Sequence, residues 1–371
     1  MSNYQKITDV KSVAGIDALY YQLIINITDY IEFYLNAKEN NFSRIRSFNK
    51  LSQDWEKEYT FFQLDDKKNN MTVCQVGFKN LNTNDGKEFV KIQLSSSYFN
   101  TFGITESITF VNEKLEEIGL VSYGTKITRI DLNTYVYGYD FSYLEYDYFK
   151  TLTRKHSNIY GESGNVETFE LGSRSNTKAP FLRIYNKWLE LKQNDKKEVK
   201  QAIIQYKFYK KYGVADLNYD TQLWNVEFEL KRDFLKRFEI NSVEDCLSSV
   251  NTIHNYLMQD IKLMNKKYKT TTRKAKDTMR ISPIWNLISK EYNFNNSDYP
   301  RNKIKTVKHI KDENWLSNRI EEYLSENPMT NDPLQLQYIQ KLKDVLELGR
   351  KLQINSQNLT RKLKQQKNDK Y

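Results

Sequence analysis

Three segments of the sequence place charged and polar side chains at alternate positions. Each set is spaced by two residues: Arg129, Asp131 and Asn133 in the first segment, Arg183, Tyr185 and Lys187 in the second, and Asn225, Glu227, Glu229 and Lys231 in the third. Because successive side chains of a β-strand point to opposite faces, each set would share one face of a strand. If the three strands are neighbours, one surface carries carboxylates, cations and a tyrosine hydroxyl.

This combination of side chains is suited to chemistry on a phosphate group. A tyrosine hydroxyl has a pKa near 10 and needs a nearby cation or metal to act as a nucleophile at neutral pH. A divalent ion on Asp131 and Glu227 could polarise a phosphate, while Arg183 and Lys187 would stabilise negative charge on its oxygens. The predicted product is a covalent bond between a tyrosine and a DNA phosphate.

The same alternation also occurs in sheets without any catalytic function. A half-solvated antiparallel sheet shows it on its exposed face, and opposite charges across its strands stabilise it modestly. A single strand of this kind would favour that structural interpretation. Three strands with the same placement, one with Tyr185 between Arg183 and Lys187, favour a phosphate-handling site.

The elements that must position these residues belong to an α+β fold. Apolar and alternating runs predict strands, and helical periods predict helices at 29–37, 111–118, 143–152 and 199–212. The predicted strands are 18–26, 59–64, 71–78, 88–94, 126–137, 181–188 and 222–231. Strands joined by hairpins and occasional helices indicate a largely antiparallel, curved β-sheet with flanking helices over residues 1–240.

Residues 241–371 form a predicted second region that is mostly helical and basic. From Ser242, a plausible N-cap, apolar residues recur at helical spacing. Residues 251–371 contain 24 Lys and Arg against 13 Asp and Glu, a net charge of +11, while residues 1–250 contain 33 against 34. The whole basic excess of the chain therefore lies in its last third, as expected for a region that binds DNA phosphates.

Composition excludes several classes of protein. Cys74 and Cys246 are the only cysteines, and the three histidines are scattered, so neither a disulfide framework nor a thiolate or histidine-rich zinc site is expected. A bound metal would be held mainly by carboxylates, which favours Mg²⁺ or Mn²⁺. No apolar run is long enough to span a membrane, and the N-terminus lacks a signal-peptide pattern, so a soluble, cytoplasmic protein is expected.

Four short motifs in order resemble the replication initiation factor family, which comprises rolling-circle initiators of plasmids and some filamentous phages together with related relaxases. The motifs are Thr128-Arg129-Ile130-Asp131-Leu132, Phe169-Glu170-Leu171-Gly172-Ser173-Arg174, Phe181-Leu182-Arg183-Ile184-Tyr185-Asn186-Lys187 and Val226-Glu227-Phe228-Glu229-Leu230. The resemblance covers about residues 15–235. It implies an enzyme that nicks one strand at an origin, stays joined to the 5′ phosphate and leaves a 3′ hydroxyl that primes synthesis.

The resemblance also implies roles for individual residues. Tyr185 would be the nicking tyrosine, Arg183 and Lys187 would contact the phosphate, and Asp131 and Glu227 would bind Mg²⁺ or Mn²⁺. Tyr135 stands where many members have a second aspartate, so the metal set would be either incomplete or completed by Glu229. The predicted DNA contacts are Arg129, Ser173, Arg174, Lys266, Lys267, Lys269, Arg273, Lys274 and Lys276.

The expected partners are origin DNA, in single-stranded or hairpin form, a second copy of the chain and a host helicase. Two alternatives stay open at this point. The chain could be a relaxase of an integrative or conjugative element, or a sequence-specific DNA-binding protein whose sheet charges are only structural. A role of the loop histidine His156 in the site is also left open.

Overall fold

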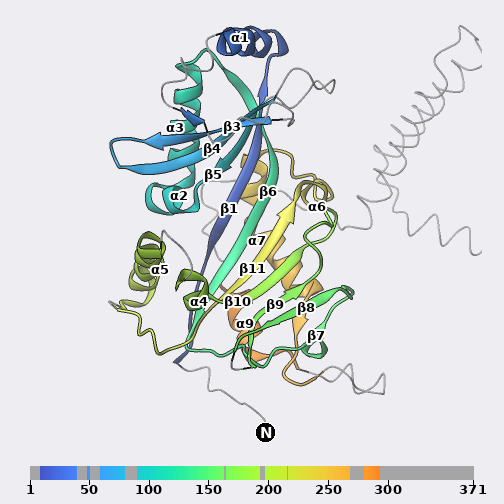
Figure 1. Ribbon diagram of the computed structural model, residues 1–371. Helices are drawn as coiled ribbons and strands as arrows, with labels where there is room; N and C mark the ends of the chain where they lie inside the picture. The colour runs from blue at the N-terminus through green and yellow to red at the C-terminus, as the bar shows by residue number, and fades with distance from the viewer. Residues whose placement is uncertain are drawn as a thin grey trace, which may run out of the picture. The chain divides into compact units, whose positions relative to one another are not determined.

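Ten strands form one sheet in which every strand runs antiparallel to its neighbours (Figure 1). The computed structural model describes residues 9–39, 48–50, 59–79, 90–162, 164–192, 197–214, 216–267 and 280–292. The order across the sheet is β2-β3-β4-β5-β1-β6-β11-β10-β9-β8. The strands are β1 Lys11–Ile25, β2 Phe48–Lys50, β3 Tyr59–Asp66, β4 Met71–Lys79, β5 Val90–Leu94, β6 Ser122–Tyr137, β8 His156–Tyr160, β9 Val166–Leu171, β10 Phe181–Asn186 and β11 Leu223–Lys231.

Two long strands, β1 and β6, pair along almost their whole lengths and join the two halves of the sheet (Figure 1). The β3–β4–β5 strands continue the sheet from β1, and β11, β10, β9 and β8 continue it from β6. The β1–β6 ladder is irregular between Ile16 and Ala18, where Asp17 has no partner on β6. An unpaired extra residue of this kind is a β-bulge, which bends the strand and redirects a side chain.

Helices cover both faces of the central strands. The described helices are α1 Ile27–Glu39, α2 Ser96–Phe102, α3 Ile104–Glu116, α4 Lys187–Lys192, α5 Lys197–Tyr212, α6 Arg232–Lys236, α7 Val243–Asp260 and α9 Pro283–Ser289. On one face, α4 and α5 pack around Tyr135 through Trp188, Ile204 and Phe208. On the other face, His254 of α7 and Trp285 of α9 make ring contacts with Phe228 of β11.

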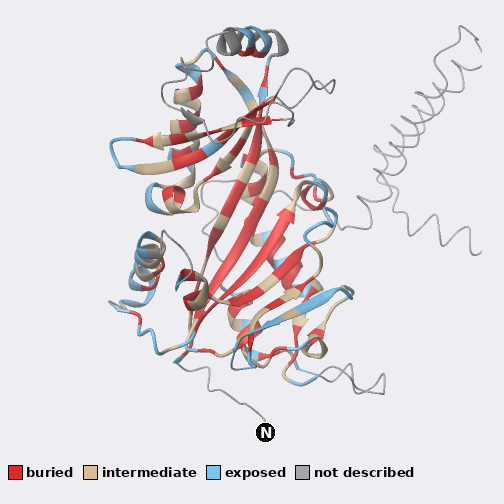
Figure 2. Ribbon diagram, in the orientation of Figure 1, coloured by how far each residue is buried: buried red, intermediate tan, exposed pale blue. Residues whose placement is uncertain are grey.

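The central strands are buried along most of their lengths (Figure 2). Leu19, Ile130, Leu132 and Leu230 have no or almost no exposed surface. Burial of apolar side chains contributes roughly 25 cal/mol per Å² of area removed from water. The middle of the sheet is therefore a rigid platform for the polar side chains on its other face.

The predicted α+β class and antiparallel sheet are confirmed, as are the hairpin of β3 and β4 and the helices that correspond to α1 and α5. The helix predicted at 143–152 is wrong. That segment holds a 3₁₀ turn at Tyr146–Tyr148 and the short strand β7, Phe149–Lys150, which pairs with β12, Lys262–Leu263. Aromatic residues have low helix propensity, and here a partner more than a hundred residues away in the chain decides the conformation.

The strand predicted at 181–188 ends two residues early. β10 stops at Asn186, and Lys187 begins helix α4. The side chain of Asn186 accepts a hydrogen bond from the backbone N–H of Leu189 at 3.2 Å. This bond satisfies one of the unpaired N–H groups at the helix start, as an N-cap residue does.

The helix predicted to start after Ser242 is confirmed as α7. Ser242 Oγ accepts the backbone N–H of Asp245 at 3.0 Å, and the Asp245 carboxylate accepts the N–H of Ser242 at 3.0 Å. This reciprocal pair is a capping box. Residues 268–279 and 293–371 of the predicted basic region 241–371 lie outside the described residues, and the domain boundary near residue 240 stays a prediction. No helix of the described part is long and apolar enough to cross a bilayer.

Replacing Ser242 with alanine should destabilise the protein by about 1 kcal/mol, because the N–H of Asp245 loses its partner at the start of α7. The free energy of unfolding in urea is the measurement. Ser248→Ala in the same helix is the matched control, since Ser248 Oγ only donates to the carbonyl of Asp245 inside the helix. Equal losses from the two variants would contradict the capping role.

Candidate functional site

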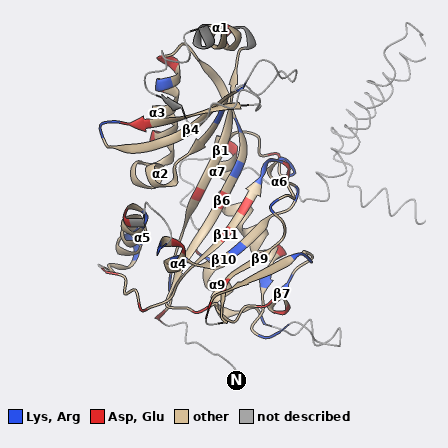
Figure 3. Cartoon of the chain, in the orientation of Figure 1, with Lys and Arg blue, Asp and Glu red and all other residues tan. Residues whose placement is uncertain are grey.

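The three polar segments found in the sequence lie on neighbouring strands, as predicted. β11 lies between β6 and β10, and Figure 3 shows acidic and basic positions along these strands. Glu227 of β11 is paired with Asn133 of β6 on one side and with Arg183 of β10 on the other. Directly opposed residues of antiparallel strands share a face, so the polar sets converge on one surface of the sheet.

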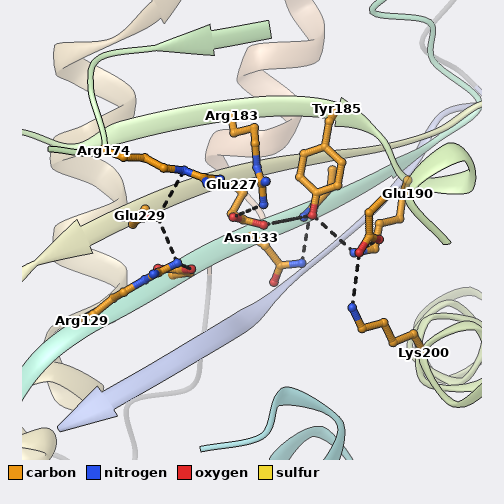
Figure 4. A network of polar contacts seen from close by, with 12 residues as sticks. Arg129, Asn133, Arg174, Arg183, Tyr185, Glu190, Lys200, Glu227 and Glu229 are labelled. Carbon is orange, nitrogen blue, oxygen red and sulfur yellow. Dashed lines mark hydrogen bonds and ion pairs between the residues drawn. The ribbon is translucent and has the colours of Figure 1, made fainter. Parts of the chain in front are cut away.

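Tyr185 is at the centre of a buried hydrogen-bond network (Figure 4). Its hydroxyl donates to Glu227 Oε2 at 3.1 Å and accepts from Asn225 Nδ2 at 2.8 Å and Lys187 Nζ at 3.3 Å. The guanidinium of Arg183 lies 4.3 Å from the centre of the tyrosine ring. The phenol is only 6% exposed. A carboxylate and two cations therefore surround one phenol group.

The electrostatics of this network favour a neutral phenol at rest. Burial and the Glu227 carboxylate raise the pKa of Tyr185 well above 10, although Arg183 opposes this shift. Burial also raises the pKa of Glu227, and Asp17 adds to that rise, while Arg183 and Lys187 lower it. Movement of the phenol proton to Glu227 keeps the net charge of the pocket constant. The cost of desolvating a negative charge is therefore largely the same before and after the transfer.

A second ionic cluster lies beside the first, between β6 and β11. Both carboxylate oxygens of Asp131 accept from Arg129, at 2.8 and 2.5 Å, and Arg129 also pairs with Glu229 at 3.0 Å. Lys231 pairs with Glu229 at 3.2 Å. Burial raises the pKa of Asp131 to about 7 against the opposing effect of Arg129, and the carboxylates of Glu227 and Glu229 add to this rise. Arg129 is thus the main cation that compensates two buried acids.

The chemistry of these side chains suits a hard divalent cation, although the described residues contain no cluster of three His, Cys, Asp or Glu side chains arranged to bind a metal. Asp131 and Glu227 are buried carboxylates whose pKa values burial raises although each pairs with an arginine. Asn133 Oδ1, on β6 directly opposite Glu227, is buried and accepts no hydrogen bond from the described residues. Oxygen ligands of this kind are those that Mg²⁺ and Mn²⁺ prefer.

Two charged groups of the site were not predicted from the sequence. Asp17, the bulged residue of β1, influences the pKa values of Glu227 and Tyr185. Lys207 of α5 reaches the same face, where its Nζ lies 2.6 Å from the point that a Cβ of Gly15 would occupy. In the sequence, Asp17 is marked only as an acid directly before the apolar predicted strand 18–26. Helical periodicity does not indicate that Lys207 would reach the site.

Lys187 reaches the site although it is not in a strand. It is 2% exposed, and its ammonium pairs with Glu190 of α4 at 2.8 Å as well as with the Tyr185 hydroxyl. His156 does not reach the site. Its neighbour Ser157 pairs with Glu170, which faces Arg183, so His156 projects from the opposite face, where it stacks on Tyr146.

The residues predicted to bind DNA fall into two groups, those that the structure describes and those that lie outside the described residues. Arg174 is 55% exposed at the edge of the ionic cluster, 3.9 Å from Glu229, and Ser173 Oγ accepts from Lys155 at 3.2 Å. Lys267 pairs with Glu145 at 2.8 Å. Lys266 is exposed. The remaining predicted contacts, Lys269, Arg273, Lys274 and Lys276, lie outside the described residues, and DNA contact by either group stays a prediction.

Comparison with known proteins finds matches among solved structures. A solved structure of the rolling circle replication initiator protein from Geobacillus stearothermophilus matches with a TM-score of 0.42 and 13% sequence identity, covering 75% of this chain and 96% of that chain. That protein is of the class that the sequence motifs resemble. No family model and no curated protein matches the sequence. The roles of individual side chains are therefore inferred from their geometry.

Replacing Arg129 with methionine should lower the free energy of unfolding by about 3 kcal/mol or more at pH 8, because it leaves two buried carboxylates without their shared cation. This loss of stability should be smaller at low pH. The folded-state pKa of Asp131 is about 7, and removal of Arg129 raises it further, so the two folded proteins differ in the charge of Asp131 only above about pH 7, and the additional destabilisation develops as the pH rises through that value.

Urea unfolding at pH 5 and pH 8 measures this difference. Arg174→Met is the control, because Arg174 is largely exposed and 3.9 Å from its carboxylate partner. A loss for Arg129→Met that is the same at both pH values, or no larger than that of Arg174→Met, would contradict this assignment of Arg129.

Proposed function

We propose that this protein is a rolling-circle replication initiator that nicks one DNA strand through Tyr185. The observation that carries this proposal is the Tyr185 hydroxyl, which donates to a carboxylate while a lysine ammonium contacts the same oxygen. A phenol held in this way can pass its proton to Glu227 as its oxygen attacks a phosphorus atom. The motif order in the sequence supports the same activity.

The proposed step exchanges one phosphodiester for another. The Tyr185 oxygen forms a bond to the phosphorus, the bond from phosphorus to the 3′ oxygen breaks, and the 3′ oxygen takes a proton from solvent. The 5′ phosphate stays on the tyrosine, and the 3′ hydroxyl serves as the primer. Arg183 and Lys187 stabilise the charge that builds on the non-bridging oxygens.

Arg183 also links DNA binding to exposure of the phenol. Its guanidinium covers the ring of Tyr185 and holds Glu227 Oε1 at 2.8 Å, while its Nε is buried without a hydrogen-bond partner. An unpaired buried donor is costly. A phosphate that binds this guanidinium satisfies the Nε group, draws Arg183 away from Glu227 and uncovers the nucleophile.

A divalent ion would be held by Asp131 and Glu227, with Glu229 as a third ligand. When bound, Mg²⁺ or Mn²⁺ polarises the phosphate and stabilises negative charge on its oxygens. Binding by Asp131 requires Arg129 to release at least one carboxylate oxygen, since it holds both. A DNA phosphate offers Arg129 an alternative partner. We therefore propose that metal and DNA are bound together.

The basic last third of the chain would supply sequence-independent affinity for the origin. Its net charge of +11 gives a binding constant that falls steeply with salt. A second copy of the chain and a host helicase are the proposed protein partners. A relaxase of an integrative or conjugative element would use the same chemistry at Tyr185.

One observation favours a different function. Asp131, Glu227 and Glu229 all make ion pairs with arginine or lysine, as in a sheet whose charges are only structural. A non-catalytic, sequence-specific DNA-binding protein would fit this pattern. Unchanged function of an Asp131→Ala protein would support that alternative.

The Tyr185→Phe protein should form no covalent adduct with DNA, because the attacking oxygen is gone. The test uses a randomised pool of single-stranded DNA labelled at the 3′ end, with Mn²⁺, so that the fragment joined to the protein carries the label. Tyr20→Phe is the control, since Tyr20 lies on the same face beside Arg129 but outside the Tyr185 network. Adduct formation by Tyr185→Phe, or none by the unmodified protein, would refute the proposal.

Binding of Mn²⁺ should weaken by about tenfold or more in an Asp131→Asn protein, because one anionic ligand is lost. Electron paramagnetic resonance of free Mn²⁺ measures binding without reference to activity. Glu170→Gln serves as the control, since this carboxylate is on the same sheet face but in β9. Equal affinity of Asp131→Asn and the unmodified protein would remove Asp131 from the ligand set.

A further inference from the structure

Lys207 projects from α5 onto the sheet beside the Tyr185 network, and the nicking step proposed above gives it no role. Its ammonium makes no hydrogen bond or ion pair with the described residues. It lies 5.7 Å from the centre of the Tyr135 ring, and Lys187 Nζ lies at the same distance from that ring. The two lysines therefore approach the site from α5 and α4 around one aromatic side chain.

The side chain of Lys207 fits there because position 15 has no side chain. A Cβ at Gly15 would be 2.6 Å from Lys207 Nζ and 3.2 Å from Asn133 Oδ1. The ammonium and the amide oxygen thus flank the same small space. Asn133 Oδ1 is a buried acceptor without a hydrogen-bond partner among the described residues.

A chain of amides leads from this space to the nucleophile. Asn133 Nδ2 donates to Asn225 Oδ1 at 3.2 Å, and Asn225 Nδ2 donates to the Tyr185 hydroxyl at 2.8 Å and to Glu227 Oε2 at 3.1 Å. Each amide has one donating and one accepting end, so the orientation of the first amide decides that of the second. The phenol accepts from Asn225, which leaves its own proton to donate to Glu227.

We infer that Lys207 is a positioning residue for the nicking tyrosine: its ammonium contacts Asn133 Oδ1 through one water molecule in the space beside Gly15, and so fixes both amides in the orientation that directs the Tyr185 proton to Glu227. Glu227 Oε2 holds the other end of this chain through its hydrogen bond from Asn225. This inference rests on the proposed nicking function of Tyr185.

The charged surroundings of Lys207 determine when it can act. Asp17 of β1 favours its charged form and Lys187 of α4 disfavours it, while Tyr135 of β6 contributes its ring and α2 carries no charged residue. Burial is the largest effect and lowers the pKa of Lys207 to about 8. The ammonium is therefore present below pH 8 and is lost as the pH rises through that value.

The rate of adduct formation between pH 6 and pH 10 tests this inference in the full chain, with the labelled DNA pool and Mn²⁺. At pH 7, Lys207→Met should be slower by about tenfold, the effect of losing one charge-assisted hydrogen bond. The unmodified protein should slow as the pH rises through about 8 and approach the rate of Lys207→Met, which shows no such step. Lys210→Met, on the exposed side of α5, is the matched control.

Gly15→Ala provides a second variant that keeps the lysine. The added methyl group displaces the far end of a flexible side chain, and the variant should reproduce the slower rate of Lys207→Met. Full activity at pH 7 in both variants, or a step near pH 8 that persists in Lys207→Met, would overturn the inference.

A measurement without DNA separates this inference from the nicking proposal. With 3-fluorotyrosine at position 185, the ¹⁹F resonance of the protein should shift with a midpoint near pH 8 as Lys207 loses its proton. The step should vanish in Lys207→Met and remain in Lys210→Met. Failure of the unmodified protein to form an adduct would refute nicking, whereas absence of the ¹⁹F step would refute the role of Lys207.

Discussion

Removal of charge from water is the constraint on which the centre of this structure depends. Asp131, Glu227 and Glu229 project from the middle of a sheet, each is at most 5% exposed, and an isolated buried carboxylate would cost several kcal/mol. Neighbouring strands supply cations to two of these acids. Arg129 of β6 pairs with Glu229 of β11, and Arg183 of β10 lies directly opposite Glu227 of β11, whereas Asp131 pairs with Arg129 of its own strand. Pairing of the strands therefore also brings Glu229 and Glu227 to their cations.

The compensation is uneven across the site. Glu229 pairs with both Arg129 and Lys231, whereas Asp131 pairs with Arg129. Glu227 pairs with Arg183 and is otherwise held by a phenol and an amide, and Lys187 also lowers its pKa. Arg183 is the ion-pair partner of Glu227, and its guanidinium also lies 4.3 Å from the centre of the Tyr185 ring. A change in the position of this one side chain would therefore alter the surroundings of both residues.

The sequence predicts much of this arrangement because strands repeat every two residues. Alternation alone placed Asp131, Glu227 and Tyr185 on faces of three strands, and their proximity followed once those strands were neighbours. Other features depend on contacts between distant parts of the chain. Lys207 comes from a helix whose pattern marks only its apolar side, and the segment at 143–152 takes its conformation from pairing with β12. No local pattern contains that information.

The bulge in β1 has an additional consequence for how such a site changes over generations. Ile16 pairs with Leu132 and Ala18 with Asp131, so this part of the ladder would be regular without Asp17. A single-codon deletion could remove this acid and keep every other pairing of the strand, and a single-codon insertion could restore it. The number of negative charges around Tyr185 can therefore vary in steps of one without altering the framework of the sheet.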